Sequence, residues 1–184
     1  MNKTTEHSTR ILVVDDHPIV RKGIAALLCH TTASTIAEAS CAAEAIDISR
    51  KQSVDIAVID LELPDANGLQ LITRLRCTMP KTRFVVYTMH EEPWIIDELQ
   101  DTNVDAIVLK GDDPYELQMA VESVKMGIGY YSSRFKKCAN NTPGHLTERE
   151  KVEYHRKQIL RRIGAKNNVQ AVSIALKEGL LPMI

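Results

Sequence analysis

Side chains that could do phosphoryl chemistry stand at four places along the first two thirds of the sequence: the acid pair Asp15–Asp16, then Asp60, Thr88 and Lys110. Three carboxylates that meet in one pocket repel one another, which raises their pKa values unless a cation is present. Oxygen ligands of this kind suit a hard cation such as Mg²⁺, which commonly takes one or two carboxylates together with waters and phosphate oxygens. A lysine ammonium and a threonine hydroxyl suit phosphoryl oxygens. The set is typical of a site at which a carboxylate attacks a phosphoryl group and forms an acyl phosphate.

These residues follow predicted strands, which explains why their side chains should meet. Short apolar runs alternate with helical patterns, and three of the runs (ILVV, IAVI and FVVY) are nearly continuous, as in parallel strands buried on both faces. Sites in open parallel sheets form beyond the carboxyl ends of the strands. The predicted strands are 11–15, 35–39, 56–60, 84–88 and 106–109, and the predicted helices are 19–29, 42–51, 69–78, 92–101 and 114–126.

Five strand–helix units predict an α/β fold, a doubly wound five-stranded parallel sheet that ends near Met126. For the acids, the alternative interpretation is that they crowd solvent-facing loops, as single aspartates often do. An acid pair, a lone Asp, a Thr and a Lys that end four different strands in order favour the site.

The composition is that of a globular protein. With 44% hydrophobic and 26% charged residues among 184, it excludes the collagen-like, disordered and coiled-coil classes. No apolar run approaches the roughly 20 residues of a membrane helix, and the first ten residues lack the apolar core of a signal peptide. The four cysteines include no Cys-x-x-Cys pair, so we expect reduced thiols, three of them in the core, and a cytoplasmic protein.

Charge divides the sequence into an acidic body and a basic end. Residues 1–126 carry 12 Lys and Arg against 20 Asp and Glu, a net charge of −8, whereas residues 127–184 carry 11 against 4, a net charge of +7. A basic module suggests a polyanionic partner. Two surfaces of opposite sign that attract each other explain the division equally well. Between them, residues 128–144 mix Gly, Ser, Asn, Pro and Lys, which predicts an exposed linker.

The motifs around the candidate site resemble a known family. The runs ILVVDDHPIVRKGI, VIDLELPDANGL, VVYT and IVLK resemble the receiver domain of bacterial response regulators over residues 9–127, and the His-Pro after the acid pair resembles the NarL/FixJ-type subfamily. The resemblance implies a flavodoxin-like sheet of strand order 2-1-3-4-5 and phosphorylation of Asp60 by a sensor histidine kinase. Thr88 and Lys110 would hold the phosphoryl group, and Pro64 and Gly68 would shape the loop after Asp60. The implied Mg²⁺ ligands are Asp15, Asp16, Asp60 and the backbone carbonyl of Glu62.

Two positions depart from the commonest pattern of that family. Met89 follows Thr88 where a small residue is usual. Ile107 stands three positions before Lys110, where the family often has an aromatic that changes rotamer on activation. The phosphorylation chemistry survives this change, whereas the usual aromatic switch lacks its residue. The resemblance also implies that phosphorylation repacks the face made by the fourth helix, fifth strand and fifth helix, and that this face or the neighbouring helices form homodimers.

Residues 145–184 resemble a LuxR-type helix-turn-helix DNA-binding region. LTEREK and VEYHRKQILRRIGAKNNVQAVSIALKEGLL match its beginning and its recognition and final helices, and Thr147 with Glu150 fits a capping box. The alternative is a basic amphipathic helix that is only a solvated surface. The resemblance directs six side chains to DNA: Glu153, Tyr154, Arg156, Lys157, Arg161 and Lys166.

A piece of this DNA-binding region is missing. Between Lys151 and Val152 the family has further residues that complete the first helix and add the scaffold helix and the turn. Only 39 residues run from Leu146 to Ile184, and so short a unit rarely buries enough apolar surface to fold alone. Three explanations stay open: a deletion that impairs DNA binding, a natural short form that keeps phosphorylation and dimerisation, and a sequence that omits residues of a longer chain.

The sequence therefore predicts a two-component response regulator, not an enzyme, that is phosphorylated on Asp60 with Mg²⁺ and controls transcription through the truncated region. One alternative is a receiver that acts only through phosphorylation-dependent protein–protein interaction or dimerisation. Another is a Mg²⁺-dependent phosphohydrolase with Asp60 or Asp15 as nucleophile. The expected partners are a sensor histidine kinase, DNA and a second copy of the chain, and no membrane.

Overall fold

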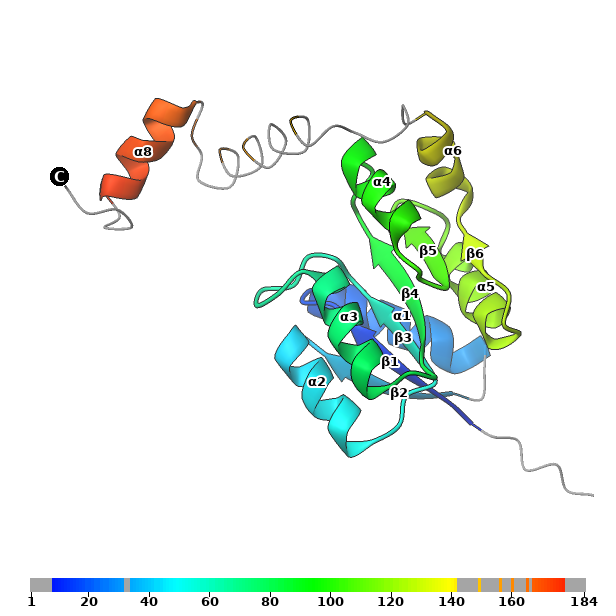
Figure 1. Cartoon of the computed structure of the whole chain (residues 1–184). Coiled ribbons are helices and arrows are strands. Elements are labelled where there is room, and N and C mark those ends of the chain that lie inside the picture. The colour runs from blue at the N-terminus through cyan, green and yellow to red at the C-terminus, as the bar shows by residue number, and fades with distance from the viewer. Residues whose placement is uncertain are drawn as a thin grey trace, which may run out of the picture. The chain divides into compact units, whose positions relative to one another are not determined.

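The computed structural model describes residues 8–31, 34–141, 149, 156, 160, 165 and 167–177. The chain divides into two compact units, Met1–Thr142 and Pro143–Ile184. The first unit is a parallel sheet with helices on both faces (Figure 1). Its elements are β1 (Thr9–Val14), α1 (Pro18–Thr31), β2 (Ser34–Ala39), α2 (Ala42–Lys51), β3 (Ile56–Ile59), α3 (Gly68–Thr78), β4 (Arg83–Thr88), α4 (Pro93–Asp101), β5 (Ala106–Leu109), α5 (Pro114–Lys125), β6 (Tyr130–Tyr131) and α6 (Ser133–Asn141).

The strands lie in the order β2-β1-β3-β4-β5-β6, and all neighbouring pairs are parallel. The predicted α/β class and the order 2-1-3-4-5 are confirmed. The predicted number of strands was one too low, because β6 adds a sixth strand that pairs Tyr130 with Ala106 and Tyr131 with Ile107. Two residues are too short a run for an alternating or continuous apolar pattern, so the sequence alone does not indicate this strand.

Alternation along the strands sends side chains into two cores. On β1, Ile11 and Val13 pack on one face of the sheet, whereas Leu12 and Val14 pack on the other. Helices α1 and α5 cover the first face, and α2, α3, α4 and α6 cover the second. Both faces of the inner strands are therefore buried, which is the physical origin of their nearly continuous apolar runs.

The structure differs from the predicted exposed linker, because residues 130–141 form β6 and α6. Helix α5 ends before Gly127, whose φ of 76° lies in the left-handed region that glycine adopts without steric cost. The Ser132 amide then donates to the Ile107 carbonyl at 2.9 Å, and Phe135 is only 3% exposed in the core. The Gly, Ser and Asn residues in this stretch are typical of a loop, so the sequence did not indicate the short apolar face of α6. That face consists of Phe135, Cys138 and Ala139.

The prediction that three cysteines fill the core is wrong. Cys29 and Cys77 are exposed on their helices, Cys41 and Cys138 are half-buried, and all four are free thiols. Within the part of the chain that the structure describes, no helix is long and apolar enough to cross a membrane.

In the second unit the structure describes α8 (Asn168–Lys177) and isolated helical positions before it. The Asn167 side-chain carbonyl accepts the Gln170 amide at 2.9 Å and thereby caps the start of α8. Of the six residues that the resemblance directs to DNA, Arg156 is helical and exposed and donates to Asn168 Oδ1 at 3.2 Å. The others lie outside the described residues: Glu153, Tyr154, Lys157, Arg161 and Lys166.

Candidate functional site

The candidate residues follow four neighbouring strands at one edge of the sheet. Asp15 follows β1, Asp60 follows β3, Thr88 ends β4 and Lys110 follows β5. Backbone bonds hold these ends side by side, because the Asp60 amide donates to the Val14 carbonyl at 3.0 Å and the Lys110 amide to the Thr88 carbonyl at 2.7 Å. The predicted convergence at the carboxyl ends of the strands is thus present in the fold.

A buried ammonium joins two of the predicted carboxylates. Lys110 Nζ lies 2.6 Å from Asp15 Oδ2 and 2.6 Å from Asp60 Oδ2. Both acids are buried, with 1% and 5% of their surface exposed, and each has its second oxygen on a backbone N–H: His17 for Asp15 at 2.8 Å and Leu61 for Asp60 at 2.7 Å. Buried charges are tolerated when they are paired and hydrogen-bonded in this way.

In this cluster, burial and pairing with opposite charges shift the pKa values of Asp60 and Lys110 in opposite directions. Burial raises the pKa of Asp60 above its ordinary value, and the Lys110 ammonium only partly offsets the rise. Burial also acts to lower the pKa of Lys110, but hydrogen bonds to Asp15 and Asp60 outweigh it, so the net change in that pKa is upward. Lys110 therefore stays charged at neutral pH and supplies a positive charge in contact with both acids.

The second member of the acid pair fits a cation. Asp16 Oδ1 is buried without a hydrogen-bond partner, although the Nδ1 atom of His17 lies 2.6 Å from it. The ligand atoms of Asp15, Asp16 and His17 lie within 4.8 Å of one another. Clustered carboxylate oxygens suit a hard cation such as Mg²⁺. The sequence did not predict His17 as a site residue. The feature that could have indicated it is its position directly after the acid pair.

The other predicted residues surround this cluster without joining it. Thr88 is fully buried, and its hydroxyl accepts the His90 amide at 3.3 Å. The side chain of Glu62 is exposed, and its carboxylate lies 3.3 Å from His90 Nε2. The contact between His90 and Glu62 joins the loop after β4 to the loop after β3. His90 also pairs with Glu92 of its own loop at 3.0 Å.

Ile107 is fully buried in the core on β5. The aromatic side chain beside Lys110 comes from β4 instead, because the ammonium lies 5.8 Å from the centre of the half-buried Tyr87 ring. A cation held over a ring face gains electrostatic attraction. Tyr87 thus touches the site from a strand position where the sequence predicts only a core residue.

The loop after Asp60 is shaped by a glycine and an acid. A Cβ on Gly68 would lie 2.2 Å from the Asp60 carbonyl oxygen, so no other side chain fits there. The Asp65 carboxylate accepts the amides of Ala42 and Ala43 at 2.8 and 2.9 Å, which caps α2 from this loop. The motif named Gly68, whereas nothing in the local sequence links Asp65 to a helix more than twenty residues earlier.

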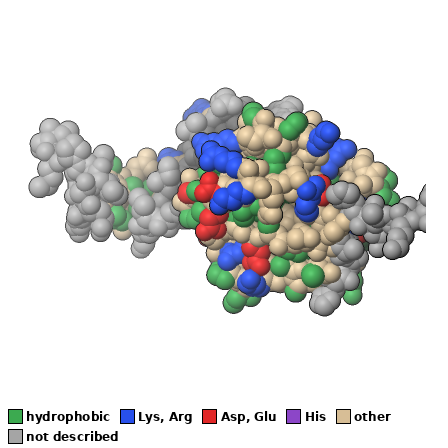
Figure 2. Space-filling view, turned by 90° about the horizontal axis from the view of Figure 1, so that it is seen from below, with side chains coloured by type: hydrophobic (Ala, Val, Ile, Leu, Met, Phe, Trp, Pro, Cys, Tyr) green, Lys and Arg blue, Asp and Glu red, His purple; other side chains and the backbone are tan. Residues whose placement is uncertain are grey.

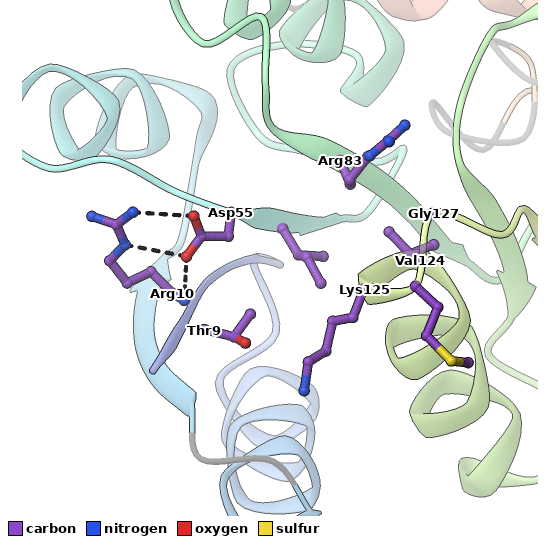
Figure 3. Close-up of a pocket in the computed structure, with 9 residues that line it drawn as sticks. Thr9, Arg10, Asp55, Arg83, Val124, Lys125 and Gly127 are labelled. Carbon is purple, nitrogen blue, oxygen red and sulfur yellow. Dashed lines mark hydrogen bonds and ion pairs between the residues drawn. The ribbon is translucent and has the colours of Figure 1, made fainter. Parts of the chain in front are cut away.

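A separate hollow lies at the opposite edge, where the strands begin. Its lining includes Arg10, Arg83 and Lys125 (Figure 3). Arg10 is held by Asp55 through two guanidinium bonds of 3.1 and 3.2 Å, and Arg83 pairs with Asp105 at 2.8 Å. On the face seen in Figure 2, Lys and Arg side chains likewise stand next to Asp and Glu. Because Arg10 and Arg83 are both paired with acids, little of the positive charge in this hollow is left to attract an anion.

Comparisons with known proteins point to one family. The model of the response regulator receiver domain matches residues 11–122. The nitrate/nitrite response regulator protein NarP of Escherichia coli K12 is 28% identical over 142 residues, which cover 77% of this chain and 63% of that protein. The methanol utilization control regulatory protein MoxX of Paracoccus denitrificans is 34% identical over 127 residues, or 68% of this chain and 57% of that protein. The chain therefore spans about three fifths of the length of these curated relatives.

Solved structures agree with the fold. A LuxR-family two-component response regulator from Aurantimonas sp. SI85-9A1 superposes with a TM-score of 0.67 at 30% identity, over 73% of this chain and 96% of that one. The isolated REC domain of RcsB from Salmonella enterica serovar Typhimurium superposes with a TM-score of 0.68 at 24% identity, over 72% of this chain and 99% of that one. The second likeness is one of fold alone.

Proposed function

Because the chain belongs to the response regulator receiver domain family, we propose that it is a response regulator whose Asp60 accepts a phosphoryl group from a sensor histidine kinase. One observation carries the proposal: Lys110 bridges Asp15 and Asp60 at the carboxyl ends of three different strands. Relatives named as nitrate/nitrite and methanol utilization regulators support a regulator over an enzyme.

The chemistry follows from the positions of the side chains. An oxygen of the Asp60 carboxylate attacks phosphorus, an O–P bond forms, and the P–N bond to the kinase imidazole breaks. Lys110, 2.6 Å from Asp60, is placed to donate to a phosphoryl oxygen, and the Thr88 hydroxyl on the neighbouring strand is a second donor. Asp60 suits the role of acceptor because it directly follows β3 and stands apart from the acid pair after β1.

Mg²⁺ would neutralise charge on the incoming phosphoryl group. We propose that it is held by the carboxylates of Asp15, Asp16 and Asp60 and the backbone carbonyl of Glu62. The close grouping of the Asp15 and Asp16 carboxylates with His17, whose ligand atoms lie within 4.8 Å of one another, supports this assignment. Asp16→Asn should then weaken Mg²⁺ binding at least tenfold in a calorimetric titration, because it removes a charged ligand from a site with few of them.

The acceptor is tested by intact-mass measurement with Mg²⁺ and acetyl phosphate. We expect the wild type to gain one phosphoryl group and Asp60→Asn to gain none. Asp47→Asn is the matched control, since this carboxylate is exposed on α2 and pairs with Arg50 on the same helix. Undiminished labelling of Asp60→Asn would remove Asp60 as the acceptor, and many turnovers on a small phosphate ester would favour the phosphohydrolase.

We further propose that residues 145–184, within the basic second unit, are the remnant of a LuxR-type DNA-binding output and that residues 9–127 hold the receiver function. The exposed Arg156 and the net charge of +7 over residues 127–184 support this part. An electrophoretic shift on promoter DNA discriminates the alternative, because a receiver that acts only through protein contacts gives no specific shift even when it is phosphorylated.

A phosphorylation-dependent homodimer is the third element of the proposal. Strand β6 and helix α6 pack on β5 and α4, which leaves less of the expected face free for a second copy. The apolar hollow between α1 and α5 stays open, and Ile19, Tyr115 and Met119 are exposed on these two helices. Light scattering of the chain with and without phosphorylation should detect a doubled mass, and Tyr115→Glu should prevent it.

A further inference from the structure

The first turn of α6 lies against the two loops that leave the candidate site. Arg134 Nη2 pairs with Glu91 Oε1 at 2.8 Å, and Arg134 Nη1 donates to the Gly111 carbonyl at 3.2 Å. Glu91 lies three residues after Thr88, and Gly111 directly follows Lys110. One guanidinium on α6 thus contacts both loops whose first residues would hold the phosphoryl group.

The contact with the second loop is close. A Cβ on Gly111 would lie 2.4 Å from Arg134 Nη1, so the guanidinium fills the space that a side chain would take. An arginine fork can serve two acceptors with a fixed geometry, which a lysine cannot reproduce. The pair with Glu91 is partly exposed and contributes little to stability by itself. The pair matters because Arg134 connects α6 to the loop after β4 through Glu91 and to the loop after β5 through Gly111.

Helix α6 is otherwise fixed to the body of the first unit. Phe135 is buried in the core, and the Ser132 amide donates to the Ile107 carbonyl at 2.9 Å. The Glu116 carboxylate on α5 accepts hydrogen bonds from the Tyr130 hydroxyl and from Ser133. Helix α6 is also the last element of the unit Met1–Thr142, so the chain passes from it into Pro143–Ile184.

We propose that Arg134 is a positioning residue that couples the loops after Thr88 and Lys110 to α6. The coupling rests on the proposed phosphorylation of Asp60. A phosphoryl group that draws Thr88 and Lys110 inward displaces Glu91 and the Gly111 carbonyl, which are the two partners of Arg134. Linkage is reciprocal, so the contacts of α6 also bias the loops in the unphosphorylated protein.

Hydrogen exchange in the full chain tests both directions of this coupling. Without phosphorylation, Arg134→Ala should raise amide exchange in residues 89–92 and 111–113 about fivefold or more, the lower end of typical coupling. With acetyl phosphate and Mg²⁺, the wild type should change exchange in α6 by a similar factor, whereas Arg134→Ala should be phosphorylated without that change. Glu91→Ala removes the same ion pair from the other side, and its effect should not add to that of Arg134→Ala.

Lys137→Ala is the matched control, because Lys137 is an exposed cation on the same helix. Loop exchange equal to wild type in Arg134→Ala, or an intact α6 response in that variant, would overturn the coupling. Absence of labelling in the wild type contradicts the proposed function instead, and the loop exchange of the unphosphorylated variants still decides whether Arg134 positions the loops.

Discussion

Lys110 is the residue on which the charge balance of the site depends. Its ammonium touches two buried carboxylates that stand 95 and 50 residues away in the sequence. Each carboxylate also accepts a hydrogen bond from a backbone N–H, so the three charges form a fully hydrogen-bonded network. Removal of one member from such a network leaves the others buried without their partner.

At this scale we expect Lys110→Ala to lower the free energy of unfolding at pH 7 by about 3 kcal/mol, because it leaves two buried carboxylates unpaired. Urea denaturation measures the change, and Lys137→Ala should stay within about 0.5 kcal/mol of wild type as an exposed lysine control. The variant should still accept some phosphate on Asp60, with a weakened structural response. Equal stability of Lys110→Ala and wild type would contradict this account.

The β3–α3 loop is the element that presents Asp60. The loop closes on itself, because the Gly68 amide donates to the Leu61 carbonyl at 2.9 Å. The Asp60 carbonyl lies so near that a Cβ on Gly68 would be 2.2 Å from its oxygen. Asp65 ties the same loop to the start of α2. The proposed acceptor Asp60 is therefore held by a loop whose conformation depends on Gly68 and on the capping acid Asp65.

Two glycines make a matched test of this element. Gly68→Ala should destabilise the protein by about 2 kcal/mol, because its Cβ overlaps backbone that cannot move freely, and it should slow phosphoryl labelling of Asp60. Gly23→Ala in α1 meets nothing within 4 Å, so it should stabilise the protein by about 0.5–1 kcal/mol through the greater helix propensity of Ala. Chemical denaturation of both variants measures the difference, and the same sign for both would refute the role of Gly68.

At the scale of the whole molecule, β6 and α6 complete the first unit. The Tyr130 hydroxyl on β6 donates to the Glu116 carboxylate on α5, and this bond is the first cause of a lowered Glu116 pKa. Burial, followed by Glu116, raises the pKa of Tyr130 to about 12. The bond fastens β6 to α5. Helix α5 covers one face of the sheet, whereas α6, which follows β6, packs on the other face.

Tyr130→Phe should therefore cost about 1 kcal/mol of unfolding free energy near pH 7. A carboxylate with a lowered pKa stabilises the fold above its ordinary value of 4.5, so the difference from wild type should shrink as the pH falls below that value. A phenol with a raised pKa stabilises below 10, and that contribution is lost between pH 10 and about 12. Urea titrations across pH measure both limbs, and Tyr131→Phe on the same strand is the control. A difference that does not depend on pH would exclude the Tyr130–Glu116 bond as its source.

The sequence by itself determined the five main strands, their helices and the positions of the candidate site residues Asp15, Asp60, Thr88 and Lys110 at the strand ends. These features follow from local patterns, since a strand buried on both faces needs a continuous apolar run and its end is where a polar side chain first appears. Gly68 could also be predicted, because it belongs to the motif after Asp60 that resembles the family.

Only the tertiary structure decided which distant side chains meet: Lys110 with two acids, Asp65 with α2, Tyr87 with the ammonium, and Arg134 with both site loops. It also decided that residues 130–141 pack as β6 and α6 and do not form a linker. The physical reason is the same in each case. Contacts between residues far apart in the chain depend on the register and packing of whole elements, which no local pattern of residue types encodes.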